Sequence, residues 1–297
     1  MTVPMTVAVV GTGRMGGAMV ATLRRAGFNV RAWNRTTDVA RDVAARAGAE
    51  AMADLTQAVS GADVVLSSLA DDAAVLDTYT RDDGVVPALR DGHIVLEMST
   101  IAPRTARRIG QMVSERGARL LDAPVSGSVP AAEKGELTVM VGGDRSTLER
   151  ARPVLDALAT KVFHVGELGA GATVKLAVNA LVHAIDVGLS EALVLAERAG
   201  VDRSVAYDVF AGGAAAAPFV LYKRQAFEHP GETPPAFSLD LMAKDLDLIL
   251  DLAREVGAPM DQAAQNRETV GRALAAGFEG RDMSAVAAYL RDASGDR

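Results

Sequence analysis

Short runs of β-branched residues alternate with helix-like stretches through the first half of the chain, and this alternation constrains the fold more than any other feature. The strand-like runs are residues 6–10, 29–33, 63–67, 93–97, 119–121, 137–141 and 161–165. The helical patterns between them are residues 14–26, 37–47, 102–116 and 145–158. Strand–helix alternation predicts a doubly wound, mostly parallel sheet with helices on both faces.

The pattern changes after the glycine-rich segment 166–171. No convincing strand follows it, and residues 172–199 form one long apolar stretch that is expected to be a single helix. Further helices are predicted at 203–210, 218–227, 239–256, 260–275 and 284–292, with a proline-rich loop at 229–235. We therefore expect an α/β domain over residues 1–165 and an all-helical domain over 166–297. The long helix, apolar around most of its girth, should be buried in its own domain or against another subunit.

Composition excludes several classes of function. The 297 residues include 31 Lys and Arg against 38 Asp and Glu, a net charge of −7, which argues against a general binder of nucleic acids or anionic membranes. The absence of cysteine excludes disulfides, zinc–thiolate sites and cysteine nucleophiles, and the four scattered histidines make a metal centre unexpected. The start lacks the features of a signal peptide and the apolar runs elsewhere are too short to span a bilayer, so a soluble, cytoplasmic protein is expected.

The first strand leads directly into a G-x-G-x-x-G motif formed by Gly11, Gly13 and Gly16, with Arg14 and Met15 between the last two. The first glycine allows a tight turn, the second lets backbone approach a pyrophosphate, and the third lets the helix pack closely on the strand. A motif between a strand and a helix at this place predicts a Rossmann domain that binds a dinucleotide. The alternative is a glycine-rich turn that binds nothing.

The end of the second strand indicates which dinucleotide is bound. NAD sites end this strand with Asp or Glu, which accepts hydrogen bonds from the ribose hydroxyls, whereas this chain has Asn34, Arg35 and Thr36. Arg35 can hold a 2′-phosphate through paired donors, and Asn34 and Thr36 can add hydrogen bonds. We therefore expect NADP (NADPH) as the cofactor, with NAD possible but less favoured. The alternative is that Arg35 only covers the strand end at the surface.

Lys175 and Asn179 lie four residues apart near the start of the long helix, so both project from one face. That face can look into a cleft between the domains, beside the nicotinamide. Burial lowers the pKa of a lysine and makes its amine a usable acid and base near neutral pH. The alternative is that the Lys175 amine reaches bulk solvent from the first turn of the helix.

Taken together, these residues resemble the β-hydroxyacid dehydrogenases, the family of 3-hydroxyisobutyrate dehydrogenase, tartronate semialdehyde reductase and glyoxylate/succinic semialdehyde reductases, within the 6-phosphogluconate dehydrogenase superfamily. The resemblance covers nearly the whole chain and rests on residues 9–16 (VVGTGRMG), 122–128 (DAPVSGS), 169–179 (GAGATVKLAVN) and 244–246 (KDL). It implies an oxidoreductase that transfers a hydride between a nicotinamide and a small β-hydroxyacid or semialdehyde, without a metal, as a homodimer or tetramer.

The resemblance also implies roles for individual residues. Lys175 matches the general base of alcohol oxidation and general acid of carbonyl reduction, and Asn179 matches the residue that holds the substrate. Ser126, Gly127 and Ser128 match the loop that binds the substrate carboxylate. Many members carry a second glycine where this chain has Ser128, so the identity of the substrate stays open.

Five further residues match cofactor contacts of the family. Leu69 and Ala70 match the loop over the adenosine and ribose, and Thr100 matches a threonine near the nicotinamide. Phe237 and Lys244 match cofactor contacts from the helical domain. The alternatives are plain packing for Leu69 and, for Lys244, an ion pair with Asp240 or Asp247 on its own helix.

Two other functions compete with this interpretation. NADP-dependent imine reductases share the fold and the N-R-T strand end but usually carry Asp or Tyr in place of the lysine. A non-catalytic NADP-binding sensor would be expected to lose the acid/base residue. Because both Lys175 and Asn179 are present, we favour the dehydrogenase over both alternatives.

Overall fold

The computed structural model describes residues 5–232 and 234–295. Its residues form two compact units, one ending at Lys175 and the other beginning at Leu176. The division falls inside helix α9 (Ala170–Arg198). Each unit has its own hydrophobic core, so each is described by itself.

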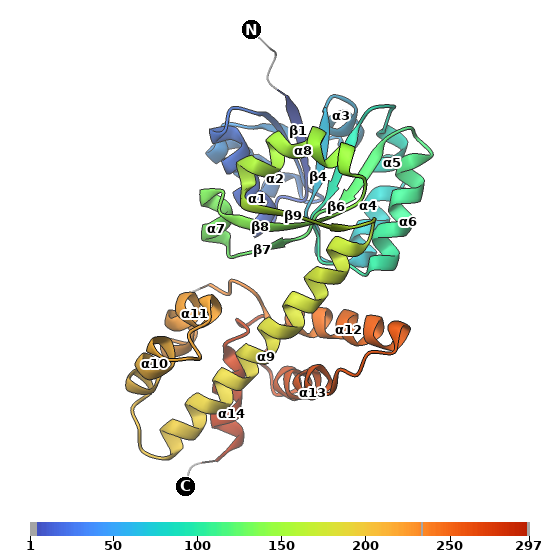
Figure 1. Ribbon diagram of the computed structural model, residues 1–297. Coiled ribbons are helices and arrows are strands. Elements are labelled where there is room, and N and C mark those ends of the chain that lie inside the picture. The colour runs from blue at the N-terminus through green and yellow to red at the C-terminus, as the bar shows by residue number, and fades with distance from the viewer. Residues whose placement is uncertain (1–4, 233, 296–297) are drawn as a thin grey trace. The chain divides into compact units, whose positions relative to one another are not determined.

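The first unit contains a nine-stranded sheet (Figure 1). Its strands are β1 (Thr6–Val10), β2 (Asn29–Trp33), β3 (Glu50–Met52), β4 (Val64–Ser67), β5 (Ile94–Glu97), β6 (Arg119–Asp122), β7 (Val125–Ser126), β8 (Leu137–Gly142) and β9 (Ala159–Gly166). The strand order is β3-β2-β1-β4-β5-β6-β8-β7, with β9 paired to β8. Strands β1 to β6 pair in parallel, and β8 is antiparallel to β6 and β7. The predicted doubly wound, mostly parallel sheet is confirmed.

Helices cover both faces of this sheet because its strands are apolar on both faces. The helices are α1 (Arg14–Arg25), α2 (Thr37–Ala47), α3 (Leu55–Ser60), α4 (Asp72–Thr80), α5 (Val85–Ala88), α6 (Pro103–Ser114), α7 (Val129–Lys134) and α8 (Arg145–Leu158). Successive side chains of a strand point to opposite faces. Val7 and Val9 accordingly pack with residues of α1, α2 and α8, whereas Ala8 and Val10 pack with residues of α3 to α6.

Several short elements of this unit were absent from the sequence prediction. They are β3, α3, α4, α5, β7 and α7, of which α4, the longest, has nine residues. Two of these helices have an N-cap residue that the sequence shows, since Asp is a preferred N-cap. Asp54 caps α3 by accepting a hydrogen bond from Gln57 N, and Asp71 caps α4 by accepting one from Ala74 N. The others are too short for hydrophobic periodicity to show.

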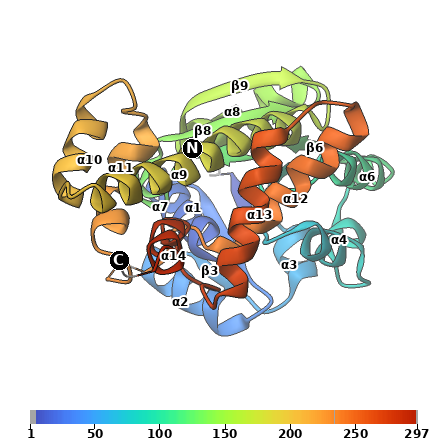
Figure 2. The same cartoon turned by 90° about the horizontal axis from the view of Figure 1, so that it is seen from below.

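The second unit is helical, as predicted. Besides most of α9 it contains α10 (Arg203–Gly212), α11 (Pro218–Glu228), α12 (Leu239–Val256), α13 (Asp261–Ala275) and α14 (Ala285–Ala293). Figures 1 and 2 place the pair α10 and α11 on one side of α9 and the pair α12 and α13 on the other. Within the described part of this unit, strand pairing is limited to an isolated bridge between Ser238 and Asp282.

Helix α9 is the one described helix that is long and apolar enough to cross a membrane by length and composition. Its apolar residues Leu176, Leu189 and Leu193 instead belong to the core that the helices of the second unit share. Of the two expected modes of burial, in its own domain or against another subunit, these three residues show the first.

Candidate cofactor and substrate site

The turn between β1 and α1 has the backbone shape that a bound dinucleotide requires. Gly11 has a φ of +91°, and a Cβ there would overlap the carbonyl oxygen of Ser68. A Cβ on Gly16 would overlap the carbonyl oxygen of Gly11, whereas a Cβ on Gly13 would meet nothing within 4 Å. Two glycines therefore permit close packing, and the third leaves open space beside the backbone, where a pyrophosphate can approach.

The start of α1 is suited to an anion. The N-cap residue of α1, Gly13, has no side chain that could cap this helix end, and the first turn, which begins with the exposed Arg14 and the half-buried Met15, contains no acidic residue. Its first N–H groups therefore keep their hydrogen-bonding capacity at the positive end of the helix dipole. Together with the open space at Gly13, this helix end fits the pyrophosphate of a dinucleotide.

The end of β2 lies beside this turn. The Asn34 side chain joins the two, because Oδ1 accepts a hydrogen bond from Thr12 N at 3.2 Å and Nδ2 donates to Thr36 O at 3.2 Å. Each of these Asn34 atoms keeps capacity for one more hydrogen bond. Arg35 and Thr36 are exposed. The strand end thus offers a guanidinium and neutral polar groups, and no carboxylate.

Glu97, at the end of β5, ties together the two other loops expected to touch the cofactor. Its Oε1 accepts from Ser99 N at 2.8 Å, and its Oε2 accepts from Ser67 Oγ at 2.6 Å. The Ser99 hydroxyl in turn accepts from Leu69 N at 2.8 Å. The Leu69–Ala70 loop is therefore fixed to the segment that leads to Thr100. Burial raises the pKa of Glu97 despite these hydrogen bonds.

Asp122, at the end of β6, joins the candidate substrate loop to the start of α9. Its side chain is 1% exposed, Oδ1 accepts from Gly169 N at 2.8 Å, and Oδ2 accepts from Ala172 N at 2.7 Å. Ala172 lies three residues before Lys175, and Asp122 lies four residues before Ser126. One carboxyl group thus connects the DAPVSGS and GAGATVK segments. Burial raises the pKa of Asp122.

The residues of the candidate substrate loop stand at the protein surface. Ser126 on β7 and Ser128 before α7 are half-buried, and Gly127 is exposed. Ser128 occupies the N-cap position of α7, but its side chain makes no capping hydrogen bond. The two hydroxyls and the backbone N–H groups of this loop are the kind of donors that bind a carboxylate. Lys175, on the second turn of α9, is also half-buried.

In the second unit, the predicted residues Asn179 and Lys244 meet at Asp245, which is 0% exposed. Asn179 Nδ2 donates to Asp245 Oδ2 at 2.5 Å, and Lys244 Nζ lies 2.8 Å from Asp245 Oδ1. Burial acts to raise the pKa of Asp245, but His183 and Lys244 outweigh it and hold the pKa below its ordinary value. Lys244 thus forms an ion pair on its own helix, but with Asp245, whereas the alternative named Asp240 or Asp247. Its contact with the cofactor, like that of Phe237, stays a prediction.

The sequence analysis did not predict a role for four residues of this arrangement: Glu97, Asp122, Asp245 and His183. The acids Glu97 and Asp122 had a signal, since each ends a strand whose interior residues are apolar, where a carboxylate needs partners. His183 stands four residues after Asn179 on the same helix face. The Asp245 contact joins residues 66 positions apart in the sequence, which periodicity does not show.

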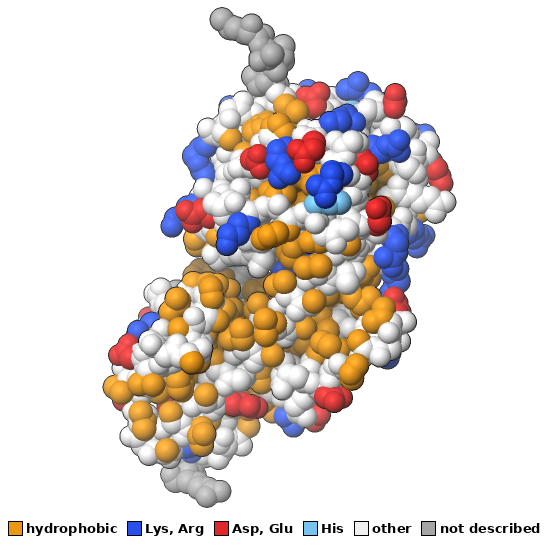
Figure 3. Space-filling view, viewed as in Figure 1, with side chains coloured by type: hydrophobic (Ala, Val, Ile, Leu, Met, Phe, Trp, Pro, Cys, Tyr) orange, Lys and Arg blue, Asp and Glu red, His pale blue; other side chains and the backbone are white. Residues whose placement is uncertain are grey.

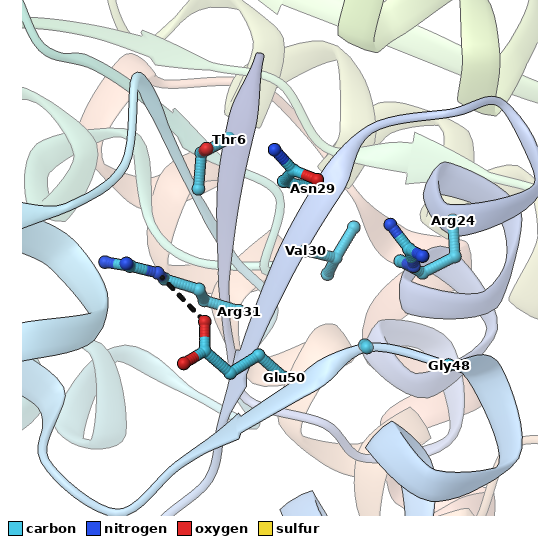
Figure 4. A pocket seen from close by; sticks show the side chains of 8 residues that line it. Thr6, Arg24, Asn29, Val30, Arg31, Gly48 and Glu50 are labelled. Atoms are coloured by element: carbon cyan, nitrogen blue, oxygen red, sulfur yellow. Dashed lines mark ion pairs between the residues drawn. The ribbon is translucent and has the colours of Figure 1, made fainter. Parts of the chain in front are cut away.

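A hollow of about 410 Å³ lies at the other end of the strands (Figure 4). It is lined by Thr6, Asn29 and Glu50, the first residues of β1, β2 and β3, and an ion pair joins Arg31 Nε to Glu50 Oε2 at 3.3 Å. Parallel sheets of this kind bind ligands outside the carboxyl ends of their strands. This hollow therefore lies away from the candidate site.

Comparison with known proteins agrees with this geometry. Residues 6–166 match the family described as the NAD binding domain of 6-phosphogluconate dehydrogenase, and residues 169–290 match the family described as NAD-binding of NADP-dependent 3-hydroxyisobutyrate dehydrogenase. An NAD-dependent L-serine dehydrogenase of Pseudomonas aeruginosa is 35% identical over 94% of this chain and 96% of its own length. A 3-hydroxyisobutyrate dehydrogenase of the same organism is 34% identical over 96% of this chain and 98% of its own length.

A solved structure extends the similarity to three dimensions. The 3-hydroxyisobutyrate dehydrogenase of Mycobacterium tuberculosis with L-serine has a TM-score of 0.82 and 34% identity, and the match covers 97% of this chain and 100% of that one. The fold and the cofactor turn define an oxidoreductase with a nicotinamide dinucleotide-binding domain. The chain belongs to the β-hydroxyacid dehydrogenases, the family of NAD(P)-dependent hydroxyacid dehydrogenases that includes 3-hydroxyisobutyrate dehydrogenase.

Replacing Asp122 with Ala should destabilise the protein strongly. The Gly169 and Ala172 N–H groups would lose a buried acceptor, which we expect to lower the free energy of unfolding by about 2–5 kcal/mol. Chemical denaturation followed by circular dichroism measures the change. Asp144→Ala is the matched control, because Asp144 caps α8 through Thr147 N at the surface, and its loss should be smaller. Equal losses for the two variants would contradict the role of Asp122.

Proposed function

We propose that this protein is an NADP-dependent dehydrogenase of small β-hydroxyacids resembling 3-hydroxyisobutyrate, which in reverse reduces the corresponding semialdehydes. The observation that carries the proposal is the buried Asp122 contact. It joins the loop of Ser126 to the helix that bears Lys175, within the unit that also bears the glycine turn. A carboxylate-binding loop, an amine and a dinucleotide turn are the parts that this reaction needs.

Each residue then has a defined task. Ser126 and the backbone N–H groups of its loop bind the substrate carboxylate, and Asn179 holds the substrate beside Lys175. The neutral Lys175 amine takes the proton from the substrate hydroxyl, and the ammonium returns it to the carbonyl oxygen during reduction. A nicotinamide dinucleotide held by the glycine turn of Gly11, Gly13 and Gly16 would supply the acceptor for the hydride of the carbinol carbon. Breaking the O–H and C–H bonds together forms the carbonyl, so no further reactant is needed.

The substrate class is supported by the names of the relatives. One is an L-serine dehydrogenase and another a 3-hydroxyisobutyrate dehydrogenase. Both named compounds carry a hydroxyl on the carbon β to a carboxylate and differ in the group between the two. The proposal therefore concerns the spacing between the hydroxyl and the carboxylate. The Ser126 loop would bind the carboxylate, and Lys175 would meet the hydroxyl.

The preference for NADP is supported by the residues at the end of β2. An exposed guanidinium follows Asn34, and no acid stands there to repel a 2′-phosphate or to bind the ribose hydroxyls of NAD. The relative named as an NAD-dependent L-serine dehydrogenase shows that NAD use occurs at this level of similarity.

A second copy of the chain is proposed as the partner of the helical unit. Figure 3 shows apolar side chains gathered over much of the visible face of this unit. Large apolar side chains exposed on α9, α10 and α11 include Leu181, Leu195, Val205, Val209 and Leu221, with exposures of 54–73%. Exposed apolar side chains in this number are typical of a surface that another protein covers. Because Leu181 and Leu195 lie on α9, the long helix would take part in a homodimer or tetramer.

Lys175→Ala should abolish turnover and leave cofactor binding intact. Loss of a general acid and base lowers kcat by about a hundredfold to ten-thousandfold. NADPH oxidation with a panel of small semialdehydes, and NADP⁺ reduction with 3-hydroxyisobutyrate and L-serine, measure the activity, and NADPH fluorescence measures binding. Lys161→Ala, which removes an exposed lysine of β9, is the control. Tight NADPH binding without wild-type turnover on any substrate would favour a sensor.

Arg35→Ala should weaken the use of NADPH selectively. Loss of a charge-assisted hydrogen bond to the 2′-phosphate should raise the KM for NADPH by about tenfold or more, while the KM for NADH stays constant. Arg41→Ala, on the neighbouring surface of α2, should leave both constants unchanged. A wild-type enzyme with equal kcat/KM for the two cofactors, or one that prefers NADH, would refute the proposed preference.

The proposed assembly predicts a molar mass of two or four chains in light scattering at micromolar concentration. Replacing the exposed Leu195 with Asp should shift that mass toward a single chain, because a buried unpaired carboxylate is costly at an apolar interface. A wild-type mass of one chain would contradict the assembly.

A further inference from the structure

His183 is a buried imidazole that the proposed reaction does not yet use. It lies one turn beyond Asn179 on the same face of α9, and its side chain is 2% exposed. Neither ring nitrogen has a hydrogen-bond partner among the described residues. The ring stacks on Phe237, with centroids 6.0 Å apart and planes inclined by 29°. Because an unsatisfied buried polar group costs free energy, its presence here calls for a function.

The imidazole faces the carboxylate that already holds Asn179. His183 Nε2 lies 3.8 Å from Asp245 Oδ2, the oxygen that accepts the Asn179 amide hydrogen at 2.5 Å. The other carboxylate oxygen pairs with Lys244. A separation of 3.8 Å is too long for a direct hydrogen bond. Hydrogen bonds of active sites are often long before substrate binds and tighten in the complex.

This geometry fixes which end of the Asn179 amide points to Asp245. An ionised carboxylate only accepts hydrogen bonds, so the amide must present Nδ2 to it. The Asn179 Oδ1, an acceptor, is then the atom directed away from Asp245. An acceptor suits the hydroxyl of an alcohol substrate, which is a donor.

We propose that His183 is a positioning residue that acts through Asp245 on the Asn179 amide, an inference that rests on the proposed function. When substrate binds and this contact shortens, the Nε2–H group of His183 becomes a second donor to Oδ2 and keeps the carboxylate turned toward Asn179. Asn179 therefore holds Oδ1 ready for the substrate hydroxyl. Without His183, the carboxylate is free to turn toward Lys244, and the amide loses its fixed orientation.

The experiment compares His183→Phe, which keeps a stacked ring but removes the donor, with His183→Gln, whose amide nitrogen restores a donor. Ser190→Ala is the control, because Ser190 is buried two turns further along α9 and donates only to Asp186 O within the helix. For the wild type and each variant, the experiment measures kcat and KM for hydroxyacid oxidation and the product inhibition by the hydroxyacid during reduction. It also measures the Kd for NADPH and the midpoint of unfolding.

We expect His183→Phe to lower kcat/KM by between about tenfold and a hundredfold, the size of effect that misplacing a substrate-holding group produces. The inhibition constant of the hydroxyacid should rise with it, because the alcohol loses an acceptor, while the Kd for NADPH stays within about twofold. His183→Gln should recover to within about threefold of wild type. Ser190→Ala should retain wild-type kinetics.

Asp245→Asn gives an independent second variant. It should lower kcat/KM as His183→Phe does, and the double variant should lose little more than either single one, because both act on the same amide. Wild-type kinetics for His183→Phe, or an equal loss for His183→Phe and His183→Gln, would overturn the positioning role. Absence of wild-type turnover on every β-hydroxyacid and semialdehyde would instead overturn the proposed function itself.

Discussion

The contact between the Asp122 carboxyl and the start of α9 is the interaction on which the candidate site depends. Its two oxygens accept the N–H groups of Gly169 and Ala172, which belong to the otherwise unsatisfied donors of a helix start. The close fit requires glycine at position 171, because a Cβ there would overlap the carbonyl oxygens of Asp122 and Met140. The start of the helix that bears Lys175 is thereby fixed to the same strand end from which the candidate substrate loop departs.

The same physical arrangement recurs at Glu97 and Asp245, each a buried carboxyl group beside a predicted site residue. The partners differ, and so do the pKa shifts. Glu97 and Asp122 accept from neutral donors, and burial raises the pKa of both. Asp245 lies against the Lys244 ammonium, and its pKa is lowered. The side chain of Asp186 on α9 has no hydrogen-bond partner among the described residues. Without such a partner to offset it, burial raises the pKa of Asp186 to about 8.

Sequence reasoning predicted the sheet, the long helices and the cofactor turn, because strand and helix periodicity and the glycine spacing are local properties. It did not predict the contacts that hold the site together. Asp122 and Gly169 are 47 residues apart, and Asn179 and Asp245 are 66 apart. Pairings at such separations follow from the fold and have no spacing rule. The short elements β3 and α5 were missed because three or four residues are too few to show a period.

Helix α9 carries both Lys175 and Asn179, the residues to which the proposed reaction assigns the proton and the substrate. Lys175 ends the first compact unit and Asn179 lies in the second; Asp122 accepts from the backbone at the start of the helix, and Asp245 accepts from the Asn179 amide. Four residues of an α-helix rise by about 6 Å, and the backbone hydrogen bonds keep that rise constant. The proposed proton-transferring lysine and the proposed substrate-holding amide are therefore about one turn apart on the same helix, and each unit contributes one buried carboxyl group that contacts α9, Asp122 in the first and Asp245 in the second.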